Sequence, residues 1–547
     1  MIIAKYVVVA NESAGYSTEI VECVDISMGV CYDCNIIRFL LKEKVHMKKS
    51  TRIFSAVLAG LLLMSAVSCS GGTDSKETSK ETTGGQTSGE TTPETEEETK
   101  KYLDDIPDNV KFDGDTVSFL ASFTSSSIAL LDNDDATEVV NDAVYNRNLI
   151  IGERLGVNIE IARGATTGYG EFNSVVTNAV AAGTEEFDVL CGHTRFNINL
   201  ASQGILKNLD NINYIDLSKE YWSQGYDNNI SYDNIHYWAT GDLSIEYIGY
   251  IYAMFVNSAM WNDHYSDTDI YSVVKEGKWT LDKLAEYAEN VYVDVNGNGE
   301  VDNDDSFGVV MQKGHVLNGM AFASNVIYTS YDENGTPYIS VNNEHTIDVF
   351  NKLHSLFYRS TGARMLENGE FDGLTEIMFP ARRLLFCPNQ FQFAGNEKIR
   401  EMEDNFYIIP MPKYDENQEN YRSNQYDGVP IYGVPITVKE SKLDTIGATL
   451  EAMCSLSSQS VIPVYYDKVL KNKYSRDAQT ADMIDLIHDS VTSDFCFAWG
   501  DTIGSMYNIF YDNIQNESIE SKLKSLEKPW GITMKRLLAK LDEYSEN

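Results

Sequence analysis

Residues 178–190, which read NAVAAGTEEFDVL, decide the fold of this chain. Apolar residues at positions 172, 175, 176, 179 and 180 recur at the spacing of one helix face, so the stretch begins as the end of a helix. Gly183 is the expected stop, because glycine readily adopts the left-handed conformation that closes helices. Residues 187–190 then form a short apolar run typical of a buried strand.

The residues before this stretch predict alternating strands and helices. Apolar residues at 117, 119, 121 and 123 alternate with others, which is the signal for a strand. A helix fits residues 137–155, which Gly156 terminates, and a second alternation at 157, 159 and 161 predicts another strand. Strand, helix, strand, helix, strand is typical of an α/β layer with a mostly parallel sheet.

Several segments together carry a resemblance to a known family. Residues 178–190 contain a helix ending in AG and a short strand, and a glycine-leucine segment follows at 200–209 (LASQGILKNL). Further matches are INYIDLSKEYW at 212–222, FVN at 255–257, GKWTLD at 277–282, FYIIPMPKY at 406–414, IYGVPITV at 431–438 and VIPVYYDKVLKNK at 461–473. In this order they resemble the extracellular solute-binding proteins of bacterial ABC importers (family 1, maltose-binding-like branch), over about residues 112–544.

The resemblance implies an α/β chain with a two-lobe, type II periplasmic-binding-protein-like fold. In that fold crossing strands join the lobes, and the ligand binds in the cleft between them. The expected division is lobe 1 at residues 112–242, lobe 2 at 243–428, a return segment of lobe 1 at 429–477, and lobe 2 with the C-terminal helices at 478–547.

Residues 47–68 have the pattern of a bacterial lipoprotein signal peptide. Three basic residues precede a short apolar run that ends in small residues, and Cys69 follows directly. This lipobox-like ending predicts cleavage before Cys69 and its lipidation, and a plain secretory peptide is the alternative. The polar composition of residues 69–111 predicts a disordered linker. Residues 1–46 precede the signal peptide, so we expect translation to start at Met47 and these residues to be absent from the working protein. We therefore expect an extracytoplasmic protein held to the cell membrane by a lipid anchor.

Composition narrows the function classes. The formal net charge is -39, which argues against nucleic acid as a partner, because phosphate binding needs Lys and Arg. Cys191, Cys387, Cys454 and Cys496 are widely spaced, which favours core positions over a disulfide framework or a zinc site. The sequence has no H-E-x-x-H, G-x-S-x-G or phosphate-binding glycine loop. We therefore expect a monomeric binding protein without an organic cofactor rather than an enzyme.

Residues 294–305, DVNGNGEVDNDD, match the register of a calcium-binding loop. Oxygen-bearing side chains stand at loop positions 1, 3, 5, 9 and 12, and Gly299 stands at position 6, where the sharp turn needs it. The predicted ligands of one structural Ca²⁺ are Asp294, Asn296, Asn298, Glu300 (through its carbonyl), Asp302 and Asp305. Position 12 is Asp where an EF-hand has Glu, which resembles dockerin-type loops. The alternative is an acidic, solvated turn.

Candidate ligand-binding residues follow from a rule of open α/β sheets, whose ligands lie beyond the carboxyl ends of strands. Sugar recognition also needs aromatic rings for the sugar faces and polar groups for the hydroxyls. Together these select Phe123, His193, Arg195, Trp238, Asp242, Gln390, Gln392, Tyr426, Trp499 and Asp501. For the tryptophans the alternative is a place in the core, and for Arg195 an ion pair with an internal aspartate.

The resemblance implies a substrate-binding lipoprotein that captures a solute by hinge closure and delivers it to the membrane subunits of an ABC importer. The likeness to the maltose-binding branch and the abundant aromatic residues favour a sugar or oligosaccharide, and peptides stay open as ligands. Two other classes also stay open: a lipid-anchored enzyme that degrades glycans, and a surface adhesin or sensor without a role in transport.

Overall fold

The computed structural model describes residues 5–6, 22–23, 101–122, 138–162, 168–367, 374–474 and 478–545. The chain divides into two compact units, Met1–Glu96 and Glu97–Asn547. In the first unit the short strands β1 (Lys5–Tyr6) and β2 (Glu22–Cys23) pair in antiparallel fashion. The predicted signal peptide, Cys69 and the linker before residue 101 lie outside the described residues. The rest of the fold belongs to the second unit.

Lobe 1 is built on a four-stranded sheet with the order β13-β5-β3-β4. Its strands are β3 (Asp115–Ala121), β4 (Val157–Ala162), β5 (Val189–His193) and β13 (Pro430–Gly433). β3 runs parallel to β4 and β5, whereas β13 is antiparallel to β5. Its covering helices are α2 (Glu138–Leu155), α3 (Tyr169–Ala182) and α14 (Glu440–Ser460).

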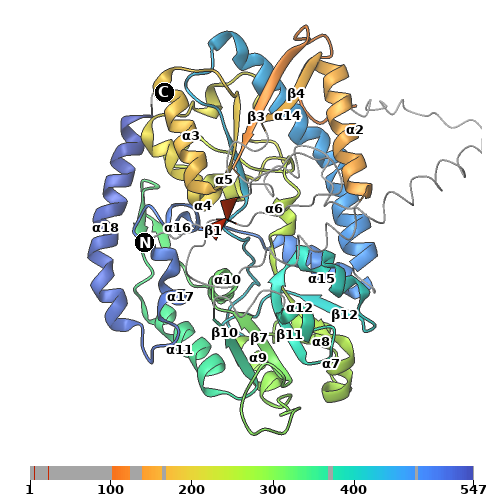
Figure 1. The fold of residues 1–547 in the computed structure, drawn as a ribbon. Coiled ribbons are helices and arrows are strands. Elements are labelled where there is room, and N and C mark those ends of the chain that lie inside the picture. The colour runs from red at the N-terminus through yellow and green to blue at the C-terminus, as the bar shows by residue number, and fades with distance from the viewer. Residues whose placement is uncertain are drawn as a thin grey trace, which may run out of the picture. The chain divides into compact units, whose positions relative to one another are not determined.

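Helices cover both faces of the lobe 1 sheet (Figure 1). Successive side chains of a strand face opposite sides. Phe119 of β3 therefore packs with α2 and α14, while its neighbour Leu120 packs with α3. Gly183 closes α3 with a φ of 65°, as the sequence predicts. The predicted strands and helices of this lobe are confirmed within the described residues.

Lobe 2 is built on a five-stranded sheet with the order β10-β7-β11-β6-β12. Its strands are β6 (Tyr252–Asn257), β7 (Phe307–Gln312), β10 (Ala363–Leu366), β11 (Leu384–Gln390) and β12 (Phe406–Ile409). β7 is parallel to β10 and β11, and β6 is antiparallel to β11 and β12. All residues of β6 are buried, as expected for a strand inside a sheet that is covered on both faces.

Several helices of lobe 2 begin at side-chain caps. The Thr280 hydroxyl accepts the Lys283 N–H at 3.3 Å, and the Asn343 side chain accepts the Thr346 N–H at 2.9 Å. The helices are α7 (Ser258–Tyr265), α8 (Ile270–Lys275), α9 (Leu281–Glu289), α10 (His315–Ala323), α11 (Glu344–Arg359), α12 (Leu374–Met378), η4 (Phe391–Gly395) and α13 (Glu397–Glu401). The strands β8 (Thr329–Tyr331) and β9 (Pro337–Ile339) form a separate hairpin.

Two chain segments cross side by side between the lobes. The first contains the short helix α6 (Glu246–Gly249) and leads into β6, and the second lies between β12 and β13. Ile251 and Gln425 pair as an antiparallel bridge, and the Tyr426 N–H donates to the Tyr250 carbonyl at 2.9 Å. The chain therefore has two α/β lobes joined by crossing strands, as the sequence predicts.

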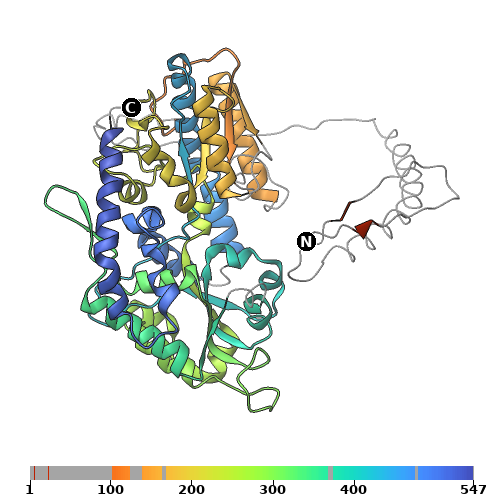
Figure 2. The same cartoon turned by 60° about the vertical axis from the view of Figure 1, so that its left-hand side comes forward.

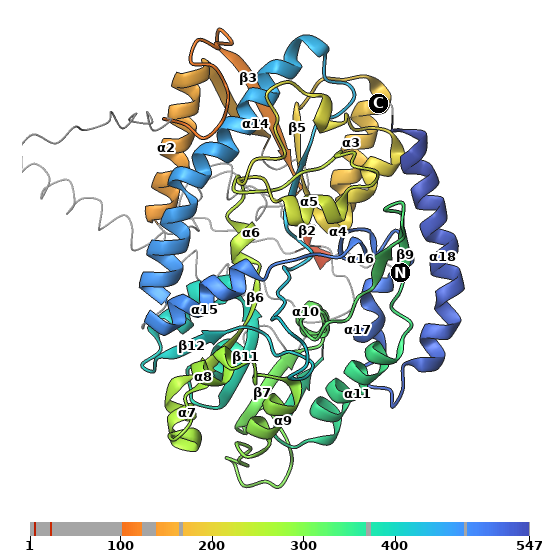
Figure 3. The same ribbon diagram turned by 180° about the vertical axis from the view of Figure 1, so that it is seen from behind.

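The C-terminal helices contact both lobes. α16 (Phe495–Trp499) packs on elements of lobe 1, and α17 (Ile509–Asn513) packs on α10 of lobe 2. α18 (Glu520–Glu543) runs along both lobes (Figures 2 and 3). The Tyr544 carbonyl beyond its end accepts the Tyr237 hydroxyl of lobe 1 at 2.6 Å, and Glu527 accepts the Asn342 amide of lobe 2 at 2.7 Å. The segment 478–547, which the sequence assigns to lobe 2, therefore also packs on lobe 1.

The remaining elements connect these parts. They are α4 (Thr194–Asn197), η2 (Ile198–Gln203), η3 (Leu209–Asn211), α5 (Gln224–Ile230), η5 (Val464–Tyr474), α15 (Ala478–Asp489), α16 (Phe495–Trp499), η6 (Met506–Asn508), α17 (Ile509–Asn513) and α18 (Glu520–Glu543). Among the helices of the described residues, none has both the length and the apolar character that crossing a membrane requires.

The predicted linker ends earlier than residue 111. Asp104 has a buried carboxylate that accepts hydrogen bonds from the Arg154 guanidinium of α2 at 2.5 and 2.7 Å. The Tyr102 ring lies 3.8 Å from the same guanidinium, and Ile106 is buried. Residues 101–111 are therefore part of lobe 1. Their composition is as polar as that of the linker before them. The local sequence therefore gives no sign that they fold, because the residues that bury them come from distant parts of the chain.

We expect Asp104→Asn to lower the free energy of unfolding by about 3 kcal/mol, because it leaves the Arg154 charge buried and unpaired. The neighbouring Asp105 pairs with Lys219 at 2.5 Å on the exposed surface. Asp105→Asn is therefore the matched control, with an expected loss below about 1 kcal/mol. Urea unfolding of the two variants measures both values, and equal losses would contradict the assignment of residues 101–111 to the folded lobe.

Candidate functional site

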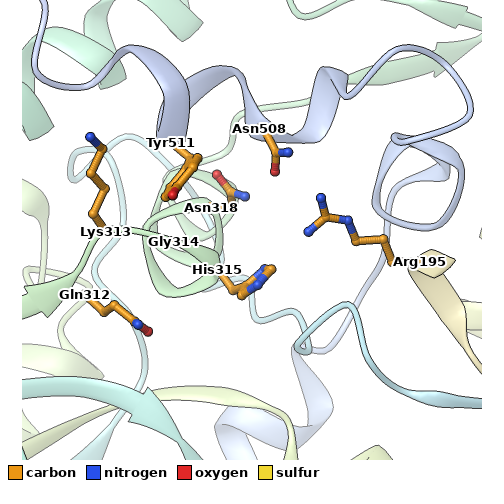
Figure 4. A pocket seen from close by; sticks show the side chains of 8 residues that line it. All are labelled: Arg195, Gln312, Lys313, Gly314, His315, Asn318, Asn508 and Tyr511. Atoms are coloured by element: carbon orange, nitrogen blue, oxygen red, sulfur yellow. The ribbon is translucent and has the colours of Figure 1, made fainter. Parts of the chain in front are cut away.

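Side chains from both lobes line a cavity of about 290 Å³ (Figure 4). The lining residues are Arg195, Gln312, Lys313, Gly314, His315, Asn318, Asn508 and Tyr511. Arg195 comes from α4 in lobe 1, and residues 312–318 come from the end of β7 and the start of α10 in lobe 2. Asn508 and Tyr511 come from η6 and α17. The cavity therefore lies where the two lobes face one another.

Arg195 is held in place by two aspartates. Its Nε donates to Asp501 at 2.8 Å and its Nη2 to the same carboxylate at 3.1 Å, while Nη1 donates to Asp427 at 3.2 Å. Burial lowers the pKa of Arg195, but the bond to Asp501 and the charge of Asp427 outweigh burial, so the pKa is raised. The guanidinium is thus charged and fixed in direction.

Asp427 lies behind the cavity, in the second crossing segment. Its carboxylate is fully buried, and its Oδ2 lies 3.3 Å from His315 Nδ1. Burial favours the neutral acid, but the interactions with His315, His193 and Arg195 outweigh that cost and lower the pKa of Asp427. Burial lowers the pKa of His193, which also lies beside Asp427, to about 4. One carboxylate thus connects lobe 1, lobe 2 and the crossing segment.

Aromatic rings surround this carboxylate. The Tyr426 ring contacts the His315 ring at a centroid distance of 4.9 Å, the His193 ring at 5.9 Å and the Tyr250 ring at 5.4 Å. All three contacts are edge-on, which is a preferred arrangement of aromatic pairs. The rings exclude water from Asp427 and strengthen its ion pairs.

Lys313 and three amides supply the rest of the polar lining. Lys313 Nζ lies 3.2 Å from Glu367 and 5.7 Å from the centroid of the Tyr511 ring. Asn318 is buried, and its Oδ1 has no hydrogen-bond partner among the described residues. Gln312, Asn318 and Asn508 can each donate and accept hydrogen bonds. The cavity is therefore suited to a ligand with many polar groups.

Four of the predicted ligand-binding residues gather at this cavity. Arg195 lines it, and Asp501 binds Arg195. His193 and Tyr426 pack in the group of side chains around Asp427. The rule that ligands lie at strand ends selects His193 and Arg195, because β5 ends at His193, whereas Tyr426 was selected near the return crossover and Asp501 in a later loop.

Trp238 and Trp499 lie in the core, where they cannot offer ring faces to a ligand in this cavity. They are 3% and 2% exposed. Their indole N–H groups donate to backbone carbonyls, that of Trp238 to Ile198 at 3.3 Å and that of Trp499 to Ile230 at 2.8 Å. The prediction that these rings contact a sugar is therefore corrected, because both side chains satisfy their polar atoms inside lobe 1.

The other predicted ligand-binding residues lie away from the cavity lining. Asp242 belongs to the first crossing segment, where burial raises the pKa of its carboxyl to about 6. The Gln392 amide donates to Gln390 near the end of β11. Phe123 lies outside the described residues.

Sequence reasoning missed most of the lining. The strand at residues 307–311 is visible in the sequence, and the strand-end rule applied to it selects Gln312, Lys313, Gly314 and His315. No comparable signal marks Asn508 or Tyr511, because a short 3₁₀ turn and a five-residue helix place them.

The loop at residues 294–305 is closed by its own hydrogen bonds. Asp294 accepts the N–H groups of Gly297 at 2.7 Å and Gly299 at 2.9 Å, and Asp305 accepts the Val295 N–H at 3.2 Å. Gly297 and Gly299 have φ values of 67° and 75°, which favour glycine. The described residues contain no group of three His, Cys, Asp or Glu side chains that could hold a metal ion. The calcium site stays a prediction.

No family model matches the sequence, and no curated protein matches it. Among solved structures, M. tuberculosis UspC covers 76% of this chain and 100% of its own, with 12% identity and a TM-score of 0.50. The chain has the type II solute-binding fold.

Two further solved structures are similar to this chain. An ABC substrate-binding protein from Listeria monocytogenes in complex with cycloalternan covers 77% of this chain and 100% of its own, with 12% identity and a TM-score of 0.49. A solute-binding protein of an ABC transporter from Thermotoga lettingae, bound with α-D-tagatose, covers 77% and 100%, with 13% identity and a TM-score of 0.49.

Two buried carboxyl groups have no basic partner among the described residues, Glu246 in the first crossing segment and Asp227 in α5 of lobe 1. Burial raises the pKa of Glu246 in α6 to about 7, and its Oε1 has no hydrogen-bond partner in the described part of the chain. Its Oε2 accepts the Ser244 hydroxyl at 2.7 Å. Burial also raises the pKa of Asp227, whose Oδ1 accepts the Thr240 N–H at 3.0 Å.

Glu246 makes stability depend on pH. Its pKa rises from an ordinary 4.5 to about 7 in the folded state, so the folded chain holds this proton more tightly than the unfolded chain. The free energy of unfolding therefore falls as pH rises from about 4.5 through about 7, by roughly 3 kcal/mol. Glu246→Gln removes this loss, so the variant should be more stable than the parent at pH 8 and similar at pH 4.5. Urea midpoints at both values check this, with the exposed Glu333→Gln as the control.

Calcium binding to the 294–305 loop would stabilise the native state alone and therefore raise the melting temperature. We expect a higher melting temperature in 1 mM CaCl₂ than in EDTA, and a smaller difference in Asp294→Asn. Asp332 accepts similar turn bonds from Asn334 and Thr336, so Asp332→Asn should keep the full calcium effect. If calcium does not change the melting temperature of the parent protein, the loop is an acidic turn without a calcium site.

Proposed function

We propose that this protein captures a polyhydroxylated solute, a sugar or oligosaccharide, in the cavity between its lobes and does not transform it. The main observation that supports this proposal is that Arg195 of lobe 1 faces residues 312–318 of lobe 2 across one polar cavity. A ligand that contacts both sides favours the conformation in which the lobes are close. The type II fold supports the same reading, because its lobes close by bending at crossing strands.

The lining chemistry fits hydroxyl groups. Three amides, a lysine, an arginine and a tyrosine supply hydrogen-bond donors and acceptors from several directions. Asn318 Oδ1 is a buried acceptor that has no partner among the described residues, so it gains a hydrogen bond when a ligand hydroxyl donates to it. The Tyr511 ring adds an apolar surface on which a sugar face can pack.

The arrangement of carboxylates supports binding over hydrolysis. Glycoside hydrolysis ordinarily needs two carboxyl groups at the scissile bond, one with a raised pKa. The eight lining residues include no Asp or Glu. Asp427 and Asp501 lie nearby but bind Arg195, and the pKa of Asp427 is lowered rather than raised. A chain with this site is better suited to hold a glycan than to cleave it.

The proposed cellular role is delivery to the membrane subunits of an ABC importer. Cleavage before Cys69 and its lipidation would hold a monomeric protein outside the membrane, with residues 70–100 as a tether. The net charge of -39 suits a soluble domain at a cell surface.

The test is a thermal-shift screen of the purified protein against mono- and oligosaccharides and against peptides, followed by calorimetry. We expect a saccharide to raise the melting temperature and to be recovered intact by chromatography. Recovery of shortened products would instead make the protein an enzyme, and a shift with peptides alone would refute the ligand class.

Two matched variants assign the binding to the cavity. Gln312→Ala removes a lining amide at the end of β7, and we expect it to weaken saccharide binding by about tenfold, as for a lost hydrogen bond. Gln392→Ala removes an amide near the end of the neighbouring strand β11, outside the lining, and should bind as the parent does. Equal effects of the two substitutions would place the ligand elsewhere.

A further inference from the structure

The lining of the cavity is basic, whereas the chain as a whole is acidic. The chain carries 82 acidic and 43 basic residues. The lining contains Arg195, Lys313 and His315 and no acidic residue. Figure 4 shows Arg195 on one side of the cavity and Lys313 on the opposite side, with His315, Asn318 and Asn508 between them. Basic side chains on two sides favour a ligand that carries a negative charge.

Arg195 keeps donors for a ligand. A guanidinium has five N–H donors, and the bonds to Asp501 and Asp427 use three of them, one each from Nε, Nη1 and Nη2. The two remaining N–H groups, one on each terminal nitrogen, belong to a guanidinium that is already fixed in direction. A fixed pair of donors is suited to a carboxylate or phosphate.

The start of α10 adds a third source of positive potential. This nine-residue helix begins at His315, directly after Gly314, and no side chain caps its first turn. The first N–H groups of a helix lack partners inside the helix and favour an anion. Gly314 and His315 both line the cavity, so these groups lie at its wall.

Nearby acids reduce this potential without filling the cavity. Asp427 and Asp501 contact Arg195, Asp427 also faces His315, and the largely exposed Glu367 contacts Lys313. None of the three belongs to the lining. They hold the basic groups in position at the wall, while the wall itself presents donors.

We propose that the solute carries an anionic group, a carboxylate or a phosphate, which binds at the start of α10 between Arg195 and Lys313. This inference rests on the proposed function and specifies its ligand as an acidic rather than a neutral saccharide. The anionic group lies at the first N–H groups of α10, with Arg195 and Lys313 on either side, and the three amides bind hydroxyls of the same molecule.

The test compares charged saccharides with their neutral counterparts. Uronic-acid oligosaccharides of one to four residues, built from glucuronate or galacturonate, are each paired with their methyl esters, and hexose 6-phosphates with the parent hexoses. Calorimetry should show at least tenfold tighter binding of the charged member of a pair. Binding should weaken as NaCl rises from 50 to 500 mM, because salt screens partly exposed charges. The uronate and phosphate arms distinguish the two anions.

Lys313→Met tests the site, since methionine keeps much of the side-chain length without the charge. We expect the preference for the charged member over the neutral one to fall by about tenfold in this variant. Lys278 is exposed and lies outside the lining, so Lys278→Met should keep the parent preference. Melting temperatures without ligand show whether either variant is unfolded.

The outcomes separate this inference from the proposed function. Neutral saccharides that bind as tightly as their charged partners would overturn the inference and leave the proposed function intact. A charge preference that survives in Lys313→Met would also overturn the assignment to this site. Binding of no saccharide in either form would overturn both.

Discussion

The buried contacts of Asp427 with Arg195 and His315 are the interaction on which the arrangement of the lobes depends. A carboxylate without water is costly to bury unless positive groups surround it. Here Arg195 of lobe 1 supplies the positive charge and His315 of lobe 2 lies 3.3 Å from the carboxylate, while Asp427 itself belongs to the second crossing segment. Because each partner compensates the same charge, the lobes and the hinge constrain one another at this point, and the cavity wall takes its shape from them.

Much of the fold could be predicted from the sequence, because its signals are local. The spacing of apolar residues and Gly183 placed β3, α2, β4, α3 and β5. The end of the linker could not be predicted in this way. Asp104 and Ile106 sit in a polar segment and become buried through Arg154 and other distant residues, so their own neighbours in sequence carry no sign of folding.

The candidate site was predictable where a strand end marks it. Arg195 follows β5, and the same rule applied to β7 would have selected Lys313 and His315. Trp238 and Trp499 show the limit of reasoning from residue type. An indole suits a sugar face and a protein core equally well, and only the partners of its N–H, here two backbone carbonyls, decide between them.

The helix α18 limits how the lobes can move. Its end is bound to lobe 1 at Tyr544, and Glu527 within it is bound to lobe 2. Seventeen residues separate these attachments, which is about 25 Å of helix at 1.5 Å per residue. A helix of this length does not stretch, so the attachments keep a constant separation as long as both hold. The lobes can then rotate about the helix, but sliding apart along its axis requires one attachment to break.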